Sequence, residues 1–402
     1  MADLSTTLPL TPSSIHEAYS KIQTHVHKTP LLTNKTINQI ASTSSSADTT
    51  GPSPKFNLYF KCENYQRIGA FKARGAFHAV THLIDELGVE EMRRRGVVTH
   101  SSGNHAQALA LAASSFNIPA HIVMPSISTP SKIAGTRSYT PHIYFSGSTS
   151  DEREAVVKEV IEETGAVLVP PYDHPDIMLG QGTTALELHQ QYDKLKTSKD
   201  EKPNLKVVLA PLGGGGLLSG ISIYFSDKST YVIGCEPSFQ GGNDGEMGFK
   251  ASPQKRVEKV KTLTIADGLR TPVGEIPWKV FTSGSNTKSR NLENIYSVDE
   301  EQIKGAMKLV LERMKVFIEP SAAVPLAVVL YNQEFRRWAY EKQREEGEEI
   351  WDIAVVFSGG NTTIEAIVGL FGDSSHGVDG REERAEGKVG LDGERVAENV
   401  AG

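Results

Sequence analysis

One lysine in this sequence stands where a charged side chain is unusual. Lys72 lies in the segment AFKARGA (residues 70–76), between small and aromatic residues and just before a helical run. Taken alone, the pattern also fits a surface lysine at the start of a helix. In an apolar pocket, however, the pKa of an amine falls, and the neutral amine becomes a nucleophile and a base. Lys72 is therefore a candidate for covalent chemistry.

A second candidate element is the polar loop HSSGNHAQ at residues 100–107, which precedes a run of alanine and leucine. A helix that begins here offers unpaired backbone N–H groups beside hydroxyl side chains, and such a terminus suits the carboxylate of a substrate. Ser102 or Asn104 could also serve as the N-cap of that helix. The two interpretations are compatible.

Two glycine-containing turns complete the set. Gly213, Gly214, Gly215 and Gly216 lie between a strand-like and a helical segment, where their N–H groups can converge on a phosphate. Their spacing matches neither the dinucleotide-binding motif nor the P-loop, and a flexible loop is the alternative. A later turn, SGGN, begins at Ser358. A lysine, a polar loop, a phosphate cradle and a polar turn are together what a phosphorylated pyridine aldehyde requires.

The elements that must position these residues alternate between apolar segments and helical patterns. Most of the apolar segments are continuous runs, as in parallel strands covered on both faces. Thr149 with Glu152, and Ser297 with Glu300, read as capping boxes ahead of amphipathic helices. The alternation predicts an α/β fold with mainly parallel sheets and flanking helices. The expected strands are 57–61, 96–100, 120–124, 206–210, 231–235 and 353–357.

Composition restricts the class of protein. The 402 residues carry a net charge of −7 without a long basic cluster, so nucleic acid is not expected as a partner. The two cysteines form no metal-binding or disulfide pattern. No signal peptide and no apolar run of ~20 residues is found, which predicts a cytoplasmic protein that does not bind membranes. Residues 41–54 read as a low-complexity surface insertion and residues 371–402 as a disordered tail.

Together these motifs resemble those of the fold type II pyridoxal-phosphate (PLP) enzymes, in particular the group of serine racemases, threonine or serine dehydratases and threo-3-hydroxyaspartate ammonia-lyases. The similarity runs from about residue 14 to about residue 364. It implies a two-domain fold similar to the tryptophan synthase β chain, with a large PLP-binding domain at 1–85 and 175–370 and a small mobile domain at 86–174. It also implies a homodimer. The segments that carry it are FKCENYQRIGAFKARGA, VVTHSSGNHAQALALAA, GQGTTALEL, PLGGGGLLSG, TIADGLRTPVG, ERMKVFIEPSAAV and VFSGGN.

The resemblance implies a role for each candidate. Lys72 carries the cofactor, Phe71 packs near its ring, and the four glycines hold its phosphate. Asn104 donates to the 3′-oxygen of the ring. Ser358 faces the pyridine nitrogen, and because a hydroxyl cannot stabilise a pyridinium as a carboxylate would, the cofactor becomes a weaker electron sink. The residues that match the site for the substrate carboxylate are Ser101, Asn104 and His105.

Ser102 bears on which reaction is catalysed. Threonine dehydratases typically have S-A-G-N-H in this loop, whereas serine racemases and hydroxyaspartate lyases have S-S-G-N-H, with the second serine as acid/base opposite the lysine. Two such groups on opposite faces are the minimum for racemisation. The resemblance thus predicts a racemase-like enzyme for small β-hydroxy amino acids, with racemisation, elimination to ammonia and a 2-keto acid, or both. The alternatives are a dedicated threo-3-hydroxyaspartate or threonine/serine dehydratase and, more distantly, an inactive PLP-binding protein.

Further positions are compared with the family in the same way. Arg153 aligns with an arginine near the racemase active site, and Tyr172 stands where the mammalian racemase has an asparagine near the substrate. Both are candidates for substrate binding. Relatives also hold Mg²⁺ or Ca²⁺ through a glutamate after a strand and an acid six residues on. Glu236 matches the first position, and Asp244 matches the second if two residues are inserted; a solvated Glu-Pro turn is the alternative.

Overall fold

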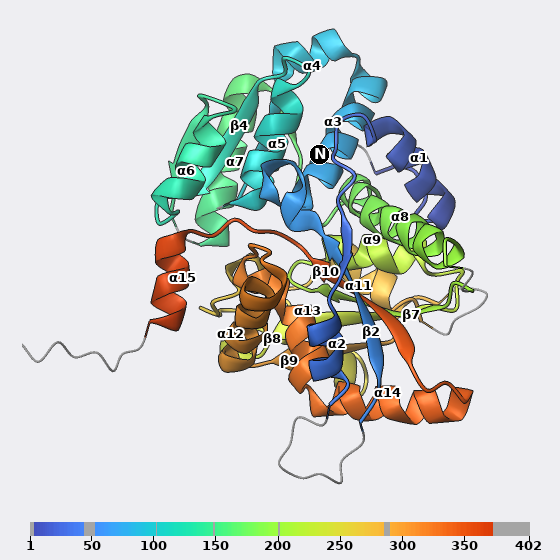
Figure 1. Cartoon of the computed structure of the whole chain (residues 1–402). Helices are drawn as coiled ribbons and strands as arrows, with labels where there is room; N and C mark the ends of the chain where they lie inside the picture. Colours follow the sequence, from blue (N-terminus) through green and yellow to red (C-terminus); the bar gives the residue numbers. More distant parts are fainter. Residues whose placement is uncertain are drawn as a thin grey trace, which may run out of the picture. The chain divides into compact units, whose positions relative to one another are not determined.

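The computed structural model describes residues 4–43, 53–101, 103–147, 149–199, 202–284 and 290–372. The chain falls into two units, 1–363 and 364–402, and the second contributes one described helix, α15 (Ile364–Phe371). Figure 1 follows the chain from end to end. Ser102, most of the predicted insertion and nearly all of the predicted tail lie outside the described residues. None of the described helices is long and apolar enough to cross a membrane.

The first unit contains a sheet of six strands in the order β1-β2-β10-β7-β8-β9. All neighbours are parallel except β1, which pairs with β2 in the antiparallel sense. Every residue of β10 is buried, which explains why this strand is a continuous apolar run. The strands are β1 (Leu31–Thr33), β2 (Phe56–Cys62), β7 (Leu205–Pro211), β8 (Tyr231–Pro237), β9 (Asn294–Val298) and β10 (Trp351–Phe357).

A second, fully parallel sheet has the order β5-β4-β3-β6. It uses residues 97–168 only, and the division into a large and a small domain stays a prediction. All six predicted strands are confirmed within two residues, and so is the α/β fold. The strands of this sheet are β3 (Val97–His100), β4 (Ala120–Pro125), β5 (Ile143–Ser146) and β6 (Val167–Leu168).

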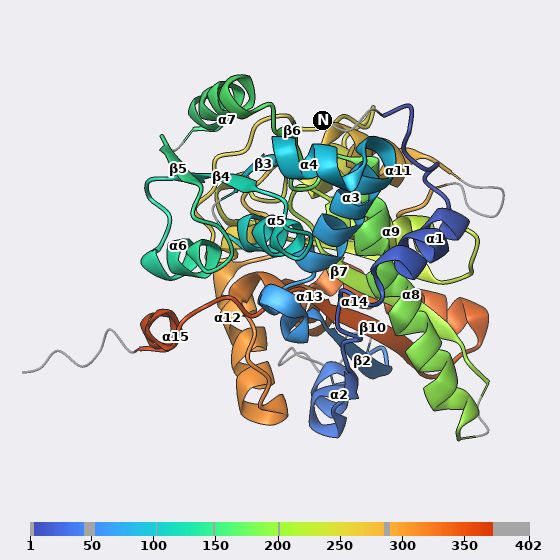
Figure 2. The same cartoon turned by 90° about the horizontal axis from the view of Figure 1, so that it is seen from above.

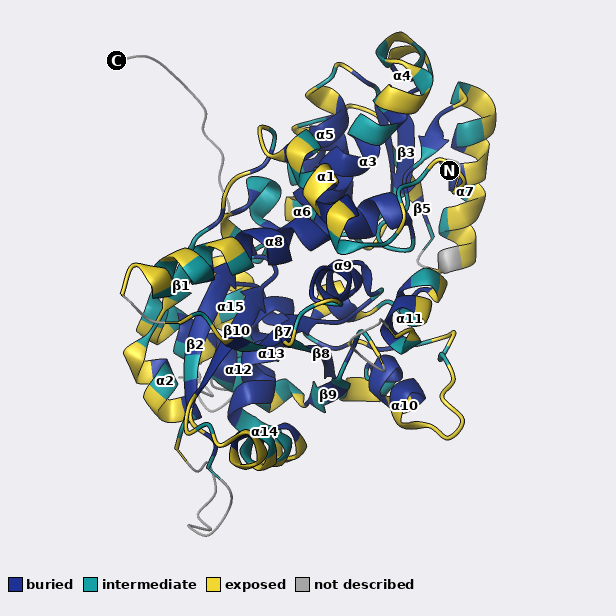
Figure 3. Ribbon diagram, turned by 90° about the vertical axis from the view of Figure 1, so that its right-hand side faces the viewer, coloured by how far each residue is buried: buried dark blue, intermediate teal, exposed yellow. Residues whose placement is uncertain are grey.

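Helices cover both sheets. Helices α8 and α9 pack on one side of the six-stranded sheet and α13 on the other (Figure 3). Helices α5 and α7 both pack against β3 and β4, and α3 lies between α5 and α8 (Figure 2). The helices are α1 (Pro12–Ile22), α2 (Lys35–Ala41), α3 (Lys72–Leu87), α4 (Val89–Arg95), α5 (Asn104–Ser114), α6 (Pro130–Arg137), α7 (Ser150–Thr164), α8 (Pro175–Thr197), α9 (Gly216–Tyr224), α10 (Asp244–Lys250), α11 (Glu275–Thr282), α12 (Glu300–Leu309), α13 (Pro320–Tyr331) and α14 (Gln333–Glu346).

Helix caps show where local sequence signals succeed and fail. The capping box of Thr149 and Glu152 is confirmed at the start of α7. The box expected at Ser297 is wrong, because α12 begins two residues later with a box made by Asp299 and Gln302. Ser297 still belongs to β9, and its hydroxyl bonds to a glutamate of α10 instead. The N-cap of α5 is Gly103, so Asn104 is the first helical residue rather than the cap.

Candidate active site

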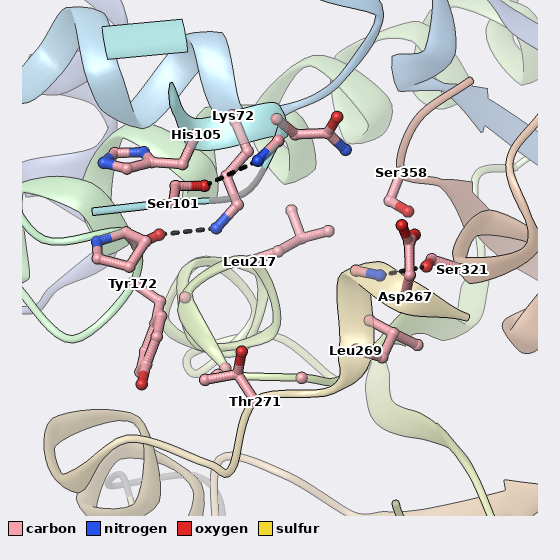
Figure 4. A pocket seen from close by; sticks show the side chains of 18 of the residues that line it. Lys72, Ser101, His105, Tyr172, Leu217, Asp267, Leu269, Thr271, Ser321 and Ser358 are labelled. Carbon is pink, nitrogen blue, oxygen red and sulfur yellow. Dashed lines mark hydrogen bonds between the residues drawn. The ribbon is translucent and has the colours of Figure 1, made fainter. Parts of the chain in front are cut away.

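A cavity of about 310 Å³ opens where β3, β7 and β10 end (Figure 4). The carboxyl ends of parallel strands are where α/β proteins usually bind ligands. The first residues of three helices line it: Lys72 of α3, Asn104 of α5 and Gly216 of α9. Within the described chain, no side-chain hydrogen bond caps α5 or α9, so their first N–H groups keep their capacity for an anion.

Lys72 is held by neutral groups. Its Nζ donates to the carbonyl oxygen of Pro171 at 2.7 Å and lies 5.2 Å from the ring centroid of Phe71. Burial lowers the pKa of this amine to about 8, because the charged form loses its hydration. The Phe71 N–H donates to the Ser358 carbonyl at 3.0 Å, so the lysine segment lies directly beside the SGGN turn. The amine is therefore close to its neutral, nucleophilic form.

The two central residues of the glycine segment tolerate no side chain. A Cβ added at Gly214 would lie 2.4 Å from Cγ of Tyr172, and one at Gly215 would lie 2.6 Å from Cβ of Pro277. Gly215 also has a φ of +94°, which favours glycine. Tyr172 thus packs against the glycine segment, and burial raises the pKa of its hydroxyl to about 12. The segment is closely packed at the start of α9, which favours a cradle over the flexible loop of the alternative interpretation.

Two histidines on the cavity wall are neutral at physiological pH. Burial, followed by the charge of Lys72, lowers the pKa of His105 to about 3, and its Nε2–H donates to the Val169 carbonyl at 3.2 Å. Burial, followed by the charge of Arg153, lowers the pKa of His100 to about 4. Neither ring is therefore a general acid near pH 7.

Several charged residues of the wall were not predicted from the sequence, among them Lys132, Asp267 and Glu319. Lys132 of α6 forms an ion pair with Asp267 across the cavity. Glu319, just before α13, is only 4% exposed, and burial together with the charge of Asp267 raises the pKa of its carboxyl to about 7. One feature of the sequence could have indicated Glu319. It is an acidic residue inside the apolar segment VFIEP, and a charge is costly to bury there unless it has a specific role.

The residues predicted to bind a cation lie away from this cavity. Both carboxylate oxygens of Glu236 accept backbone N–H groups, from Gly245 at 3.0 Å and Glu246 at 2.8 Å. Asp244 accepts the Val273 N–H at 3.0 Å. Glu236 is 1% exposed, so the solvated Glu-Pro turn is wrong. No group of three or more His, Cys, Asp or Glu side chains that could hold a metal occurs among the residues described, and the cation site at Glu236 and Asp244 stays a prediction.

The structure therefore brings most of the candidates together. Ser102 lies outside the described residues, and Glu236 and Asp244 are elsewhere. The candidates that line this cavity are Phe71, Lys72, Ser101, Asn104, His105, Arg153, Tyr172, Gly213, Gly214, Gly215, Gly216 and Ser358.

Fold and site define a pyridoxal-phosphate enzyme, and comparison with known proteins agrees. Residues 22–344 match the family of pyridoxal-phosphate dependent enzymes, and the chain belongs to this family. It is 35% identical to L-threo-3-hydroxyaspartate ammonia-lyase of Saccharomyces cerevisiae over 91% of this chain and 98% of that protein. It is 37% identical to serine racemase of Oryza sativa subsp. indica over 87% and 91%. The solved structure of maize serine racemase covers 89% of this chain and 96% of its own, with 35% identity and a TM-score of 0.73.

The residues of the cavity fit the cofactor of this family. An amine with a lowered pKa can bond to its aldehyde, and the glycine segment with the uncapped start of α9 can hold its phosphate. Ser358, only 3% exposed, offers a neutral hydroxyl from the end of β10. A hydroxyl at this position, in place of a carboxylate, suits a cofactor that acts only as a moderate electron sink.

Proposed function

We propose that this chain is a racemase-like PLP enzyme for small β-hydroxy amino acids. It racemises them, eliminates water and ammonia to give a 2-keto acid, or does both. The observation that carries this proposal is an amine of lowered pKa in one cavity with a glycine cradle and Ser358. The identity to the yeast ammonia-lyase and the rice serine racemase supports the choice of reaction.

Different residues of the cavity transfer the proton and bind the substrate. The bound cofactor withdraws electrons from the α-carbon of the substrate and so acidifies its α-hydrogen. Lys72 takes and returns this proton at Nζ, because its neutral form is accessible near pH 8. The N-terminus of α5, with Ser101 and Asn104, binds the substrate carboxylate. Arg153 and Tyr172 contact the substrate side chain.

Turnover assays test the proposal. The protein, purified with PLP, is given L-serine, D-serine, L-threonine and threo-3-hydroxyaspartate, and keto acid and enantiomer are measured together. Keto acid from any of them, or the opposite enantiomer of serine, supports the proposal. Keto acid without inverted amino acid favours a dedicated dehydratase. Cofactor binding without turnover on all four substrates would falsify the proposal in favour of an inactive binding protein.

Ser102 is proposed as the acid/base on the face opposite Lys72. The variant Ser102→Ala is expected to keep elimination and to lose racemisation by roughly 10²-fold or more, the usual contribution of one acid/base group. Ser101→Ala is the matched control, because loss of a carboxylate-binding hydroxyl weakens both reactions together. An equal loss of both activities in Ser102→Ala contradicts the two-base assignment.

Three finer expectations complete the proposal. The cytoplasmic location predicted from the sequence and the homodimer implied by the resemblance are part of the proposal, and light scattering on the purified protein tests the dimer. A divalent cation at Glu236 and Asp244 would use the lone pairs that the bonded N–H groups leave on these carboxylates. Calorimetric titration with Mg²⁺ or Ca²⁺ decides this, with Glu236→Gln as the variant in which any heat of binding must vanish.

A further inference from the structure

Asn104, at the start of α5, belongs to a chain of hydrogen bonds with two residues of the quoted motifs to which the sequence analysis assigned no role. Its Nδ2 donates to Glu319, 3.1 Å from Oε1 and 3.4 Å from Oε2. Its Oδ1 accepts from Nδ2 of Asn361 at 2.7 Å. The three residues come from the start of α5, the segment before α13 and the turn after β10. Both sides of the Asn104 amide are therefore bonded.

Two backbone groups fix the direction of this chain. Nδ2 of Asn361 also donates to the carbonyl of Ile68 at 2.7 Å, and a carbonyl can only accept. The side-chain nitrogen of Asn361 must therefore lie there, and its second hydrogen points to the oxygen of Asn104. At the other end, the backbone N–H of Asn361 donates to Oε2 of Glu319 at 3.1 Å. The amide of Asn104 can thus satisfy both neighbours in one orientation only.

Glu319 suits its place because a carboxylate accepts on both oxygens. It receives the Asn104 amide and the Asn361 backbone N–H at once. A glutamine would offer one oxygen and one nitrogen, so one of these two donors would face another donor. The site leaves no room to adjust, since a Cβ at Gly359 would lie 2.8 Å from Oε1 of Glu319. An unsatisfied polar group at such a buried position is destabilising.

The backbone turn that accepts a hydrogen bond from Asn361 is strained at Ile68. Ile68, a β-branched residue, has a φ of +58°, which is a rare conformation for it. Gly69, with a φ of +72°, lies so close that a Cβ there would be 2.7 Å from Oδ1 of Asn361. This turn immediately precedes the segment of Lys72. It holds the Ile68 carbonyl where Asn361 needs an acceptor.

We propose that Glu319 and Asn361 are positioning residues that lock the Asn104 amide as a hydrogen-bond donor toward the cofactor. In this orientation Asn104 keeps one N–H beyond that given to Glu319, and this N–H meets an acceptor oxygen on the pyridine ring. In the reversed orientation a carbonyl oxygen would face that oxygen and repel it. The inference rests on the proposed function, because it needs the pyridoxal group in the cavity.

Variants that reverse the orientation of the Asn104 amide test this proposal. Glu319→Gln removes one acceptor, and Asn361→Asp replaces the donor that faces the Asn104 oxygen by an acceptor. In the double variant E319Q/N361D, the new carboxylate at position 361 accepts from a reversed Asn104 amide, and the new amide at position 319 donates to its oxygen. The contacts of Asn104 therefore close again, while the Ile68 carbonyl loses the donor it has in Asn361. Each of the three proteins is titrated with PLP, and the dissociation constant and the visible absorbance of the bound cofactor are recorded. Thermal unfolding without PLP reports the stability.

We expect the dissociation constant of PLP to rise about tenfold or more, or about 1.4 kcal/mol, in all three variants. The absorbance should change as well, including in the double variant, in which the two contacts of Asn104 are restored in the reversed orientation. Because Asn361→Asp alone also lacks the donor to Ile68, it is the reference for that loss. The matched control is Asp352→Asn, which removes a buried acid that accepts from Tyr192 and Asn57 at the start of β10. It should lower the unfolding temperature and leave PLP binding unchanged.

Two results overturn the inference. One is a double variant that binds PLP as tightly as the unchanged protein, with the same absorbance. The other is a loss of affinity in the single variants no larger than that in Asp352→Asn. If a single variant fails to fold, the double variant still decides the question. An unchanged protein that binds no PLP would instead refute the proposed function itself.

Discussion

Two cations lie within the first turn of α3, and their surroundings differ completely. Arg74 is fully buried and bonds to both oxygens of Glu63, at 2.7 and 2.8 Å, and to both of Glu187, at 2.9 Å. Lys61 also donates to Glu187 at 2.9 Å. Lys72, two residues before Arg74, donates to a backbone carbonyl.

The pKa values follow from these partners. Burial disfavours the charge of Arg74, but Glu63 and Glu187 more than offset this, and its pKa is raised. Burial of Lys72 has no such compensation, and its pKa falls to about 8. A buried cation with carboxylate partners, such as Arg74, stays charged and stabilises the fold. A buried lysine with neutral partners, such as Lys72, becomes a reactive amine.

The largest effect is expected for Lys72→Ala. Loss of the amine removes both the attachment point of the cofactor and the base, so turnover should fall by roughly 10³-fold or more. Stability at neutral pH should not fall, because no ion pair is broken and the cost of burying the charged amine is removed. Steady-state rates and urea unfolding of the same preparation check both statements. A variant that keeps more than a tenth of the activity would show that Lys72 is not the reactive amine.

Arg74→Met is expected to show the opposite pattern. It leaves two buried carboxylates with Lys61 alone, and removal of one partner of a buried ion pair costs about 3–5 kcal/mol. Urea unfolding should report this loss, while kcat per folded molecule falls far less than in Lys72→Ala. Arg74→Lys is the control that keeps the charge but not the two-sided geometry. The comparison fails if Arg74→Met is as stable as the unchanged protein.

The contrast between these cations also marks the limit of what the sequence could predict. All six predicted strands are interior strands, whose apolar runs are continuous. The four missed strands, β1, β5, β6 and β9, all lie at sheet edges, where they are short and partly exposed and show weaker periodicity.

The residues of the candidate site also fall into those that the sequence could predict and those that it could not. Residues within contiguous motifs, such as Lys72 and the glycine segment, could be found from spacing. Glu319 and Asp267 also lie within quoted motifs, but spacing gave them no role, because tertiary packing brings them and the Pro171 carbonyl to the cavity. The misplaced box at Ser297 has a similar cause. The pattern S-x-x-E occurs there by sequence, but β9 extends through it, and the next match, at Asp299, is the one used.

A smaller effect concerns pH. The pKa of Lys72 is about 8 in the folded protein, against an ordinary value of 10.5. Between these values the unfolded chain binds more protons than the folded one, so the free energy of unfolding gains a component that rises with pH. Lys72→Met should lack this component. Urea unfolding of both cofactor-free proteins at the lower and upper ends of the window measures it. Parallel curves would mean that the folded amine titrates normally.

The smallest effect is expected at the helix cap beside Tyr172. Asp173 accepts the backbone N–H groups of Glu275 and Ile276, both at 2.9 Å, and so caps α11 from a distant segment. Asp173→Ala should cost about 1 kcal/mol of stability, as for other N-caps. Because Tyr172 packs against the glycine cradle, the dissociation constant of PLP should also rise a few-fold. Asp299→Ala, at the cap of α12, should cost the same stability and leave PLP binding unchanged. Equal PLP affinity in the two variants would show that the cap of α11 supports the fold but not the cradle.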